Sequence, residues 1–214
     1  MAMNVKANNR WIVGITGASG AVYGVTLCRF LLENGFYVHL LITDAGWRVL
    51  QDELEWIASR RAEMLETHFG PWMERLEYHP IGDIGANIAS GSYLVEGMVI
   101  VPCSMGSMAA IAAGMSNNLL QRAADVVIKE NRKLIIVPRE TPFSTIHIEN
   151  MLKLSKLGVR IIPAMPAFYN QPKTIDDLVR FQVGKVLDSM QIDNQIYDRW
   201  GADNGGFQAK NTNM

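Results

Sequence analysis

The chain has 214 residues, of which 49% are hydrophobic, and its 20 basic and 21 acidic side chains leave a formal net charge of −1. This length suffices for one substantial core. The balanced charge gives no electrostatic reason to expect nucleic acid or an anionic membrane as a partner. Two distant cysteines, Cys28 and Cys103, form no disulfide framework or paired metal-ligand spacing, and residues 1–10 lack a secretory pattern. We therefore expect a cytoplasmic chain whose partners are small molecules or its own copies.

Short β-branched runs alternate with segments of helical period along the chain. The runs predicted as buried strands are residues 11–15, 37–42, 98–101, 134–137 and 159–162. Because strands that alternate with helices are typical of a parallel sheet covered by helices, the sequence predicts an α/β fold.

Three predicted helices have recognisable ends. The first covers residues 21–34, and Gly35 is expected to end it in a left-handed conformation. Ser144 is expected to cap a later helix, and Thr174 with Asp177 resembles a capping box that opens the last one.

No linker or repeat divides the sequence. We expect a flexible N-terminus at residues 1–10, a single domain over residues 11–200, and a polar tail at residues 201–214. Residues 98–115 approach the length of a membrane span, but proline, serine and glycine interrupt them, which favours a strand followed by a loop.

Two loops of small residues follow predicted strands. The first lies in "VGITGASGAVYG", residues 13–24, and the second in "VPCSMGSMA", residues 101–109. Free N–H groups at a helix start bind phosphate or another electron-rich group, and the carboxyl ends of parallel strands share one edge. The two loops together predict a mononucleotide site, although each alone is equally explained by close packing of helices on strands.

Better-known loop motifs fit poorly. A P-loop requires a lysine after its glycines, but residues 7–128 contain none, and the glycines at positions 14, 17 and 20 depart from the dinucleotide spacing. "GASGA" is not a serine-hydrolase elbow. The Tyr-x3-Lys pair of "YNQPK" contains a proline that would break the helix it needs.

Several charged side chains lie close together in the second half of the sequence. Arg122 and Lys129 lie two turns apart on a helix predicted over residues 118–129, and Arg139 with Glu140 follows the next strand. This pattern fits either an anion site or a solvated face. Glu140 fits a proton donor or acceptor, or half of an ion pair.

Four blocks carry a resemblance to a known family: "GITGASGAVYG", "IASGSYLVEGMVIVPCSMGSMAAIAAG", "NNLLQRAADVVIKENRKLIIVPRETPFSTIHIENMLKLSKLGV" and "PAMPAFYNQPKTIDDLV". With them the chain resembles the flavin prenyltransferases of the UbiX type, also called decarboxylase B subunits, over about residues 11–200. The resemblance implies a flavodoxin-like or Rossmann-like three-layer sandwich that binds FMN and forms a dodecamer.

The resemblance also implies an activity. Family members join a dimethylallyl group from dimethylallyl monophosphate to N5 and C6 of reduced FMN, without a metal. The prenylated FMN serves UbiD-type decarboxylases.

Site residues follow from matching the motifs. The expected FMN contacts are Gly17, Ala18, Ser19, Thr43, Ser104, Met105, Gly106, Ser107 and Arg139. The prenyl phosphate is expected to lie among Arg122, Lys129, Glu140, Tyr169 and Lys185, some of them from neighbouring subunits. Ser19 and Glu53 match residues that manage protons near flavin N5, and with Lys129 and Glu140 they form the expected catalytic set.

Two positions depart from the family pattern. Lys185 stands where we expect arginine, so the charge is kept but the two-pronged guanidinium is lost. Ile84 and Gly85 stand where some members have tryptophan. These changes bear on donor preference more than on the class of reaction.

Two rival functions remain open. One is an FMN-dependent decarboxylase of the cysteine type, which would need a histidine near the first helix, and residues 16–32 contain none. The other is a non-catalytic carrier that hands FMN to a decarboxylase.

Overall fold

A computed structural model of the chain describes residues 9–199. Its centre is a sheet of six parallel strands in the order β3-β2-β1-β4-β5-β6. The strands are β1 (Arg10–Ile15), β2 (Tyr37–Ile42), β3 (Leu76–His79), β4 (Gly97–Cys103), β5 (Lys133–Pro138) and β6 (Arg160–Ile161). The order reverses between β1 and β4, which is where open α/β sheets bind ligands.

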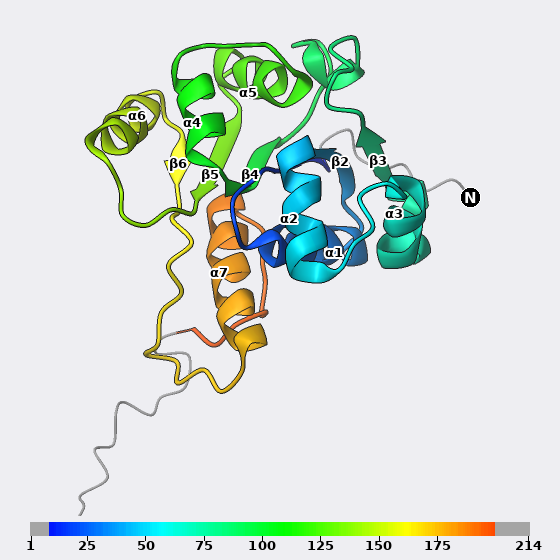
Figure 1. Ribbon diagram of the computed structural model, residues 1–214, viewed down its shortest axis with the longest axis vertical. Helices are drawn as coiled ribbons and strands as arrows, with labels where there is room; N and C mark the ends of the chain where they lie inside the picture. Colours follow the sequence, from blue (N-terminus) through cyan, green and yellow to red (C-terminus); the bar gives the residue numbers. More distant parts are fainter. Residues whose placement is uncertain (1–8, 200–214) are drawn as a thin grey trace, which may run out of the picture. The chain divides into compact units, whose positions relative to one another are not determined.

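Helices cover both faces of this sheet (Figure 1). They are α1 (Ala21–Glu33), α2 (Asp44–Leu54), α3 (Arg61–Phe69), α4 (Met105–Ala112), α5 (Leu119–Lys129) and α6 (Thr145–Lys156), with 3-10 turns η1 (Gly70–Arg75) and η2 (Asn87–Ala89). Side chains alternate along β1, so that Gly14 meets Leu120 of α5 while Ile15 packs against Gly24 of α1. The result is the predicted α/β sandwich.

The chain divides after Ala164 into two compact units. The first contains the whole sheet. The second contains α7 (Ile175–Met190) and the segments around it.

The predicted elements are present with small shifts at their ends. All five predicted strands occur, although the last is only two residues long, and β1 begins at Arg10, within the segment predicted to be flexible. Gly35 has φ 81°, the left-handed conformation that an L side chain rarely adopts. Ser144 and Thr174 both form the capping boxes of their helices.

The region between β2 and β4 was not predicted. It contains α2, α3 and β3, and β3 is a strand of four residues at the sheet edge with Glu77 and His79 in its sequence. A short strand in which charged and polar side chains face one side has no apolar run for sequence analysis to detect.

This edge carries a polar cluster of two buried histidines, His39 and His79, with the partly exposed Glu77 and Tyr93. His39 is fully buried, and its Nδ1 lies 2.9 Å from His79 Nε2 while its Nε2 lies 3.0 Å from the Tyr93 hydroxyl. Burial, together with positive charge on His79 and Arg10, lowers the pKa of His39 to about 3. Both rings are therefore neutral at pH 7.

Residues 1–8 and 200–214 lie outside the described residues, so the flexibility predicted for most of the N-terminus and the tail at residues 201–214 stay predictions. Within residues 9–199, no helix has the length and apolar character that crossing a membrane requires. Cys28 and Cys103 are buried and unbonded, and burial raises the pKa of both thiols.

Candidate functional site

The two small-residue loops meet at the point where the strand order reverses. The first follows β1 and the second follows β4, and Thr16 joins them from a fully buried position. Its hydroxyl donates to the carbonyl oxygen of Pro102 at 2.9 Å and accepts from the N–H of Ser104 at 2.7 Å. Thr16 therefore fixes the start of α4 relative to the loop of Gly17, Ala18 and Ser19.

The first turn of α4 provides hydrogen-bond donors at this edge. Ser104 is the N-cap, and its Oγ accepts from the Ser107 N–H at 3.3 Å and donates to Ser107 Oγ at 3.0 Å. The N–H groups of Met105 and Gly106 have no acceptor within the helix, as at any helix start. A side-chain atom added to Gly106 would meet nothing within 4 Å. This turn is thus open to an electron-rich group.

Thr43 lies beside the first loop, at the end of β2. Its N–H donates to the carbonyl oxygen of Ile15 at 3.0 Å, and its Oγ1 caps α2 by accepting from the Gly46 N–H at 3.0 Å. Gly17 approaches this helix so closely that a Cβ on it would lie 2.5 Å from the Cβ of Ala45. Only glycine fits there, which explains one small residue of the loop.

The start of α1 is occupied by the chain itself. The carboxylate of Glu53, at the end of α2, accepts from the N–H groups of Gly20 at 2.9 and 3.1 Å and of Ala21 at 3.0 Å. These two N–H groups at the helix start are therefore not free for a phosphate, because α2 returns a carboxylate to them, while the FMN contacts expected at Gly17, Ala18 and Ser19 stay a prediction. The same contact brings the Glu53 carboxylate to Gly20, the residue that follows Ser19. Ser19 and Glu53 are the pair that the motifs matched to residues managing protons near flavin N5.

Glu53 also affects a nearby phenol. Tyr23 follows Gly20 by three residues and is half-buried, and burial, with the negative charge of Glu53 as a second cause, raises the pKa of Tyr23. The hydroxyl is therefore a proton donor rather than an anion at neutral pH. This edge of the sheet thus combines the carboxylate of Glu53 with the hydroxyl-bearing side chains of Ser19 and Tyr23.

Arg139 and Glu140 complete the edge at the end of β5. The Arg139 N–H donates to the carbonyl oxygen of Cys103 at 3.3 Å, which ties this loop to the end of β4. The Nε of Arg139 is buried and has no hydrogen-bond partner among the described residues. Glu140 is exposed, and its Oε1 accepts from the Thr141 N–H at 2.9 Å. Arg139 thus carries an unmatched donor, the kind of group that an anionic ligand satisfies.

Arg122 and Lys129 lie elsewhere in the first unit. Arg122 donates from Nε to the carbonyl oxygen of Ala89 at 3.2 Å and pairs with Asp125, while Lys129 pairs with Glu130 at the end of α5. Lys129 thus precedes β5, whereas Glu140 follows it.

The two ends of β5 are far apart. At about 3.3 Å per residue, Lys133 and Arg139 are separated by about 20 Å, and Lys129 lies near the Lys133 end. One protomer therefore does not bring Lys129 and Glu140 together.

Tyr169 and Lys185 belong to the second unit. The ring of Tyr169 packs edge-to-face on Phe181 at 5.8 Å, and Lys185 Nζ lies 3.8 Å from a carboxylate oxygen of Asp188. Asp188 also accepts from Arg199 and from the Tyr197 hydroxyl, each at 2.6 Å. Lys185 is therefore held in an ion-pair network that sequence analysis did not identify.

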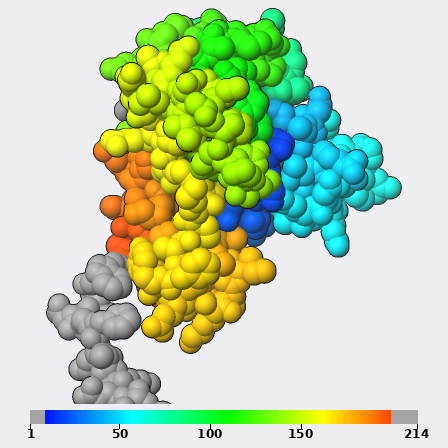
Figure 2. Space-filling view, turned by 60° about the vertical axis from the view of Figure 1, so that its left-hand side comes forward, coloured from blue at the N-terminus to red at the C-terminus, as the bar shows by residue number. Residues whose placement is uncertain are grey.

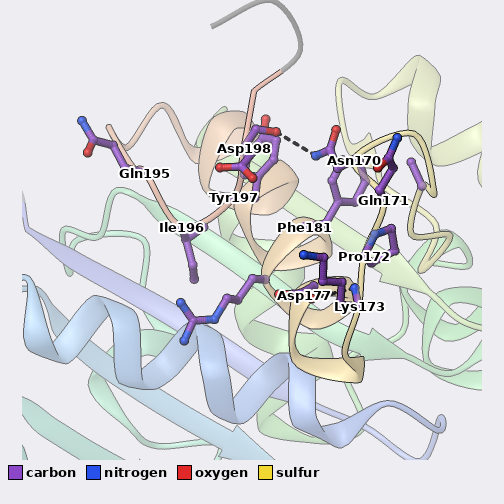
Figure 3. Close-up of a pocket in the computed structure, with 12 residues that line it drawn as sticks. Asn170, Gln171, Pro172, Lys173, Asp177, Phe181, Gln195, Ile196, Tyr197 and Asp198 are labelled. Carbon is purple, nitrogen blue, oxygen red and sulfur yellow. Dashed lines mark hydrogen bonds between the residues drawn. The ribbon is translucent and has the colours of Figure 1, made fainter. Parts of the chain in front are cut away.

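This unit contains a cavity of about 580 Å³ of its own (Figure 3). Phe181 and Tyr197 form part of its wall, and a hydrogen bond of 2.7 Å from Asn170 to the carbonyl oxygen of Asp198 crosses its upper side. The loop that carries Tyr169 is thus joined to the segment around Asp198, near the end of the described residues.

The fold and the edge described above define a flavin-binding protein of the α/β class, and the comparisons agree. The family model called Flavoprotein matches residues 3–187. A flavin prenyltransferase UbiX from Halalkalibacterium halodurans is 52% identical over 191 residues, 89% of this chain and 93% of the relative. The chain therefore belongs to the flavoprotein family and, within it, to the UbiX-type flavin prenyltransferases.

Two solved structures are also similar. A dodecameric FMN-dependent UbiX-like decarboxylase from Escherichia coli O157:H7 has a TM-score of 0.81 and 42% identity, over 89% of this chain and 98% of that one. AnUbiX (PadA1), in complex with FMN and dimethylallyl pyrophosphate, has a TM-score of 0.82 and 35% identity, over 90% and 97%. Both likenesses extend over nearly the whole fold.

Proposed function

We propose that the chain transfers a dimethylallyl group from dimethylallyl monophosphate to N5 and C6 of reduced FMN. The observation that carries this proposal is the carboxyl edge of the sheet at the strand-order reversal, where Thr16 joins the two small-residue loops. The open first turn of α4, the unmatched Nε of Arg139 and the Ser19 and Glu53 pair all belong to this edge. The names of the similar proteins support the same reaction.

The residues at this edge fit FMN. Ser104, Met105, Gly106 and Ser107 present amides and hydroxyls at a helix start, which suits a phosphate or a flavin carbonyl, and Arg139 adds a cation. Gly17 lets the first loop pack closely against α2, and Thr43 lies beside this loop.

When bound, reduced FMN supplies the electron-rich N5 and C6 positions that accept the prenyl group. Glu53, which accepts from the backbone of Gly20 and Ala21 next to Ser19, would hold or move a proton with Ser19 during the transfer. Arg122, Lys129, Tyr169 and Lys185 bind the donor phosphate and stabilise the negative charge that grows on it as it leaves. Glu140 gives or takes a proton there. Holding the donor beside the ring supplies much of the remaining acceleration.

The phosphate pocket is completed by a second protomer in this proposal, because Lys129 and Glu140 lie at opposite ends of β5. The surface of α6 supports self-association. Figure 2 shows this segment, in yellow-green, on the face turned to the viewer. It exposes Ile146, Ile148 and Leu152 by 55–66% of their surface, which is more apolar area than one helix normally leaves in water. We infer a homo-oligomer, the dodecamer being the form of the similar structure.

The wider role follows from the product. Prenylated FMN is made for a UbiD-type decarboxylase, in the cytoplasm, where the two buried thiols stay reduced. The transfer itself uses no metal, because the cations that neutralise the leaving phosphate are side chains.

The rival activities predict different products. A decarboxylase of the cysteine type would release CO2 from a peptide-like substrate, although residues 16–32 place no histidine beside the crevice. A carrier would bind FMN and change nothing in it.

The test is an anaerobic incubation of the protein with reduced FMN and dimethylallyl monophosphate, followed by mass spectrometry of the released flavin. We expect a flavin whose mass has increased by one prenyl unit. Unchanged FMN, in a preparation shown to bind FMN, would contradict the proposal. A parallel incubation with the diphosphate donor identifies the preferred leaving group.

A further inference from the structure

Two histidines and a carboxylate converge at the sheet edge, outside the flavin crevice. His39 is on β2, and Glu77 and His79 are on β3. The parallel register pairs His39 with Glu77 and Leu41 with His79, so all three polar side chains project from the same face of the sheet. They form the one group within residues 9–199 in which at least three metal-ligating side chains have their ligand atoms within 4.8 Å of one another.

The separations of the ligand atoms match those around a small cation. His39 Nδ1 lies 2.9 Å from His79 Nε2 and 3.3 Å from Glu77 Oε2, and His79 Nε2 lies 3.8 Å from Glu77 Oε1. Zinc bonds to nitrogen and oxygen are about 2.0–2.1 Å long, which places two ligand atoms of a tetrahedral site about 3.3 Å apart. The two histidines lie nearest to different oxygens of Glu77, and the three separations differ from this value by up to about 0.5 Å, so a cation can bind all three residues after small side-chain movements.

Two tyrosines orient the ligands from behind. The other ring nitrogen of His39, Nε2, lies 3.0 Å from the Tyr93 hydroxyl, and the Tyr37 hydroxyl donates to Glu77 Oε2 at 3.2 Å. Metal-binding histidines almost always carry such a partner on the nitrogen that does not face the metal, because it fixes the ring and its tautomer.

We propose that His39, Glu77 and His79 bind a zinc-type divalent cation, with water at the fourth position. Two neutral imidazoles and one carboxylate carry a charge of −1, so the cation leaves a net charge of +1 at the site. In the metal-free protein, a single proton shared between His39 Nδ1 and His79 Nε2 joins the rings. When the cation binds both of these nitrogens, the proton moves to the far nitrogen of its own ring, which for His39 is Nε2 beside the Tyr93 hydroxyl, so both imidazoles stay neutral.

The site is structural rather than catalytic in this proposal. It connects β3, the last strand at its edge of the sheet, to β2, whose carboxyl end carries Thr43. Glu77 leaves 39% of its side-chain surface exposed, so a cation can enter from solvent although both histidines are buried. Prenyl transfer does not pass through this ion.

The test uses the full-length flavin-loaded protein, treated with a chelator and then dialysed against buffered Zn²⁺. Elemental analysis should give about one zinc per chain. A competing chromophoric chelator then measures the affinity, which we expect to fall at least about 100-fold in His79→Gln and about 10- to 100-fold in Tyr93→Phe. The matched control is His147→Gln, which removes an exposed histidine but keeps a capping residue at that position, and it should bind zinc as the wild type does.

Glu77→Gln keeps the test decisive if His79→Gln does not fold. Its partly exposed side chain tolerates the change, and the loss of charge should weaken zinc binding at least about tenfold. The proposal is overturned if the wild type holds no zinc after dialysis. It is equally overturned if Glu77→Gln binds zinc as tightly as the His147→Gln control, since the zinc then lies elsewhere.

Discussion

Replacing Thr16 by valine tests whether the two small-residue loops form one site. Valine has nearly the same shape, so the change removes the hydroxyl and leaves the packing in place. The Ser104 N–H then loses its acceptor, at 2.7 Å, and the Pro102 carbonyl loses one of two donors, because the Thr16 N–H still reaches it at 3.2 Å.

The magnitude follows from these contacts. A lost hydrogen bond costs about 1 kcal/mol, and an unsatisfied N–H that is mostly shielded from water costs about 1–3 kcal/mol more. We therefore expect the free energy of unfolding to fall by about 2–4 kcal/mol. Ser104 starts α4, so we also expect FMN affinity to fall about tenfold or more, equivalent to at least about 1.4 kcal/mol.

Denaturation followed by tryptophan fluorescence measures the first effect, at equal protein concentrations because oligomer stability depends on concentration. FMN titration measures the second. Thr16→Ser keeps the hydroxyl and should retain FMN affinity. Thr67→Val is the control for a threonine-to-valine change elsewhere, because it removes an exposed hydroxyl that bonds only within its own helix. The reasoning fails if Thr16→Val binds FMN as tightly as Thr16→Ser.

Three further predictions concern the charged residues. Glu140→Gln should bind FMN normally in a titration but turn over about 100-fold more slowly or worse, as expected for a lost proton-transfer group, whereas a carrier would be unaffected. Lys129→Ala should raise the KM for the prenyl donor about tenfold or more in steady-state kinetics and spare FMN affinity. Burial alone would raise the pKa of Asp188, but hydrogen bonds from Arg199 and Tyr197 outweigh it and lower the pKa. Asp188→Asn should therefore lower the Tm at pH 7. The difference in Tm between wild type and variant should vanish as the pH falls below about 4 and through the depressed pKa of folded Asp188, because the carboxylate becomes protonated. A difference in Tm that stays constant with pH would contradict this.

The parts of the fold that follow from sequence are those with a strong local pattern. The strands at residues 11–15 and 37–42 are buried on both faces, so they appear as apolar runs, with His39 as the one polar interruption. The cap at Gly35 has a single physical cause, its left-handed backbone conformation. β3 lacks such a pattern because it lies at the edge, where His79 faces a partner on another strand. Its existence depends on pairing with β2, which no local pattern records.

The candidate site divides in the same way. Ser104 and Gly106 follow a predicted strand, so their position at the carboxyl edge could be predicted from strand order alone. The contact of Glu53 with the start of α1 could not, because it depends on α2, which was not predicted. The separation of Lys129 from Glu140 by a whole strand was implicit in the order of helix and strand, and it is the reason that a second protomer enters the proposal.

The most direct test of the shared site is the activity of mixed oligomers, made by co-expressing Lys129→Ala and Glu140→Gln chains with different tags. The assay uses a donor concentration well below the wild-type KM, where each variant alone has little activity. If the two side chains come from different protomers, random mixing gives about a quarter of the sites both native residues, and about a quarter of the wild-type activity should return. If one protomer supplied both, every site would keep one defect. Activity no higher than that of the two variants alone would then contradict the account.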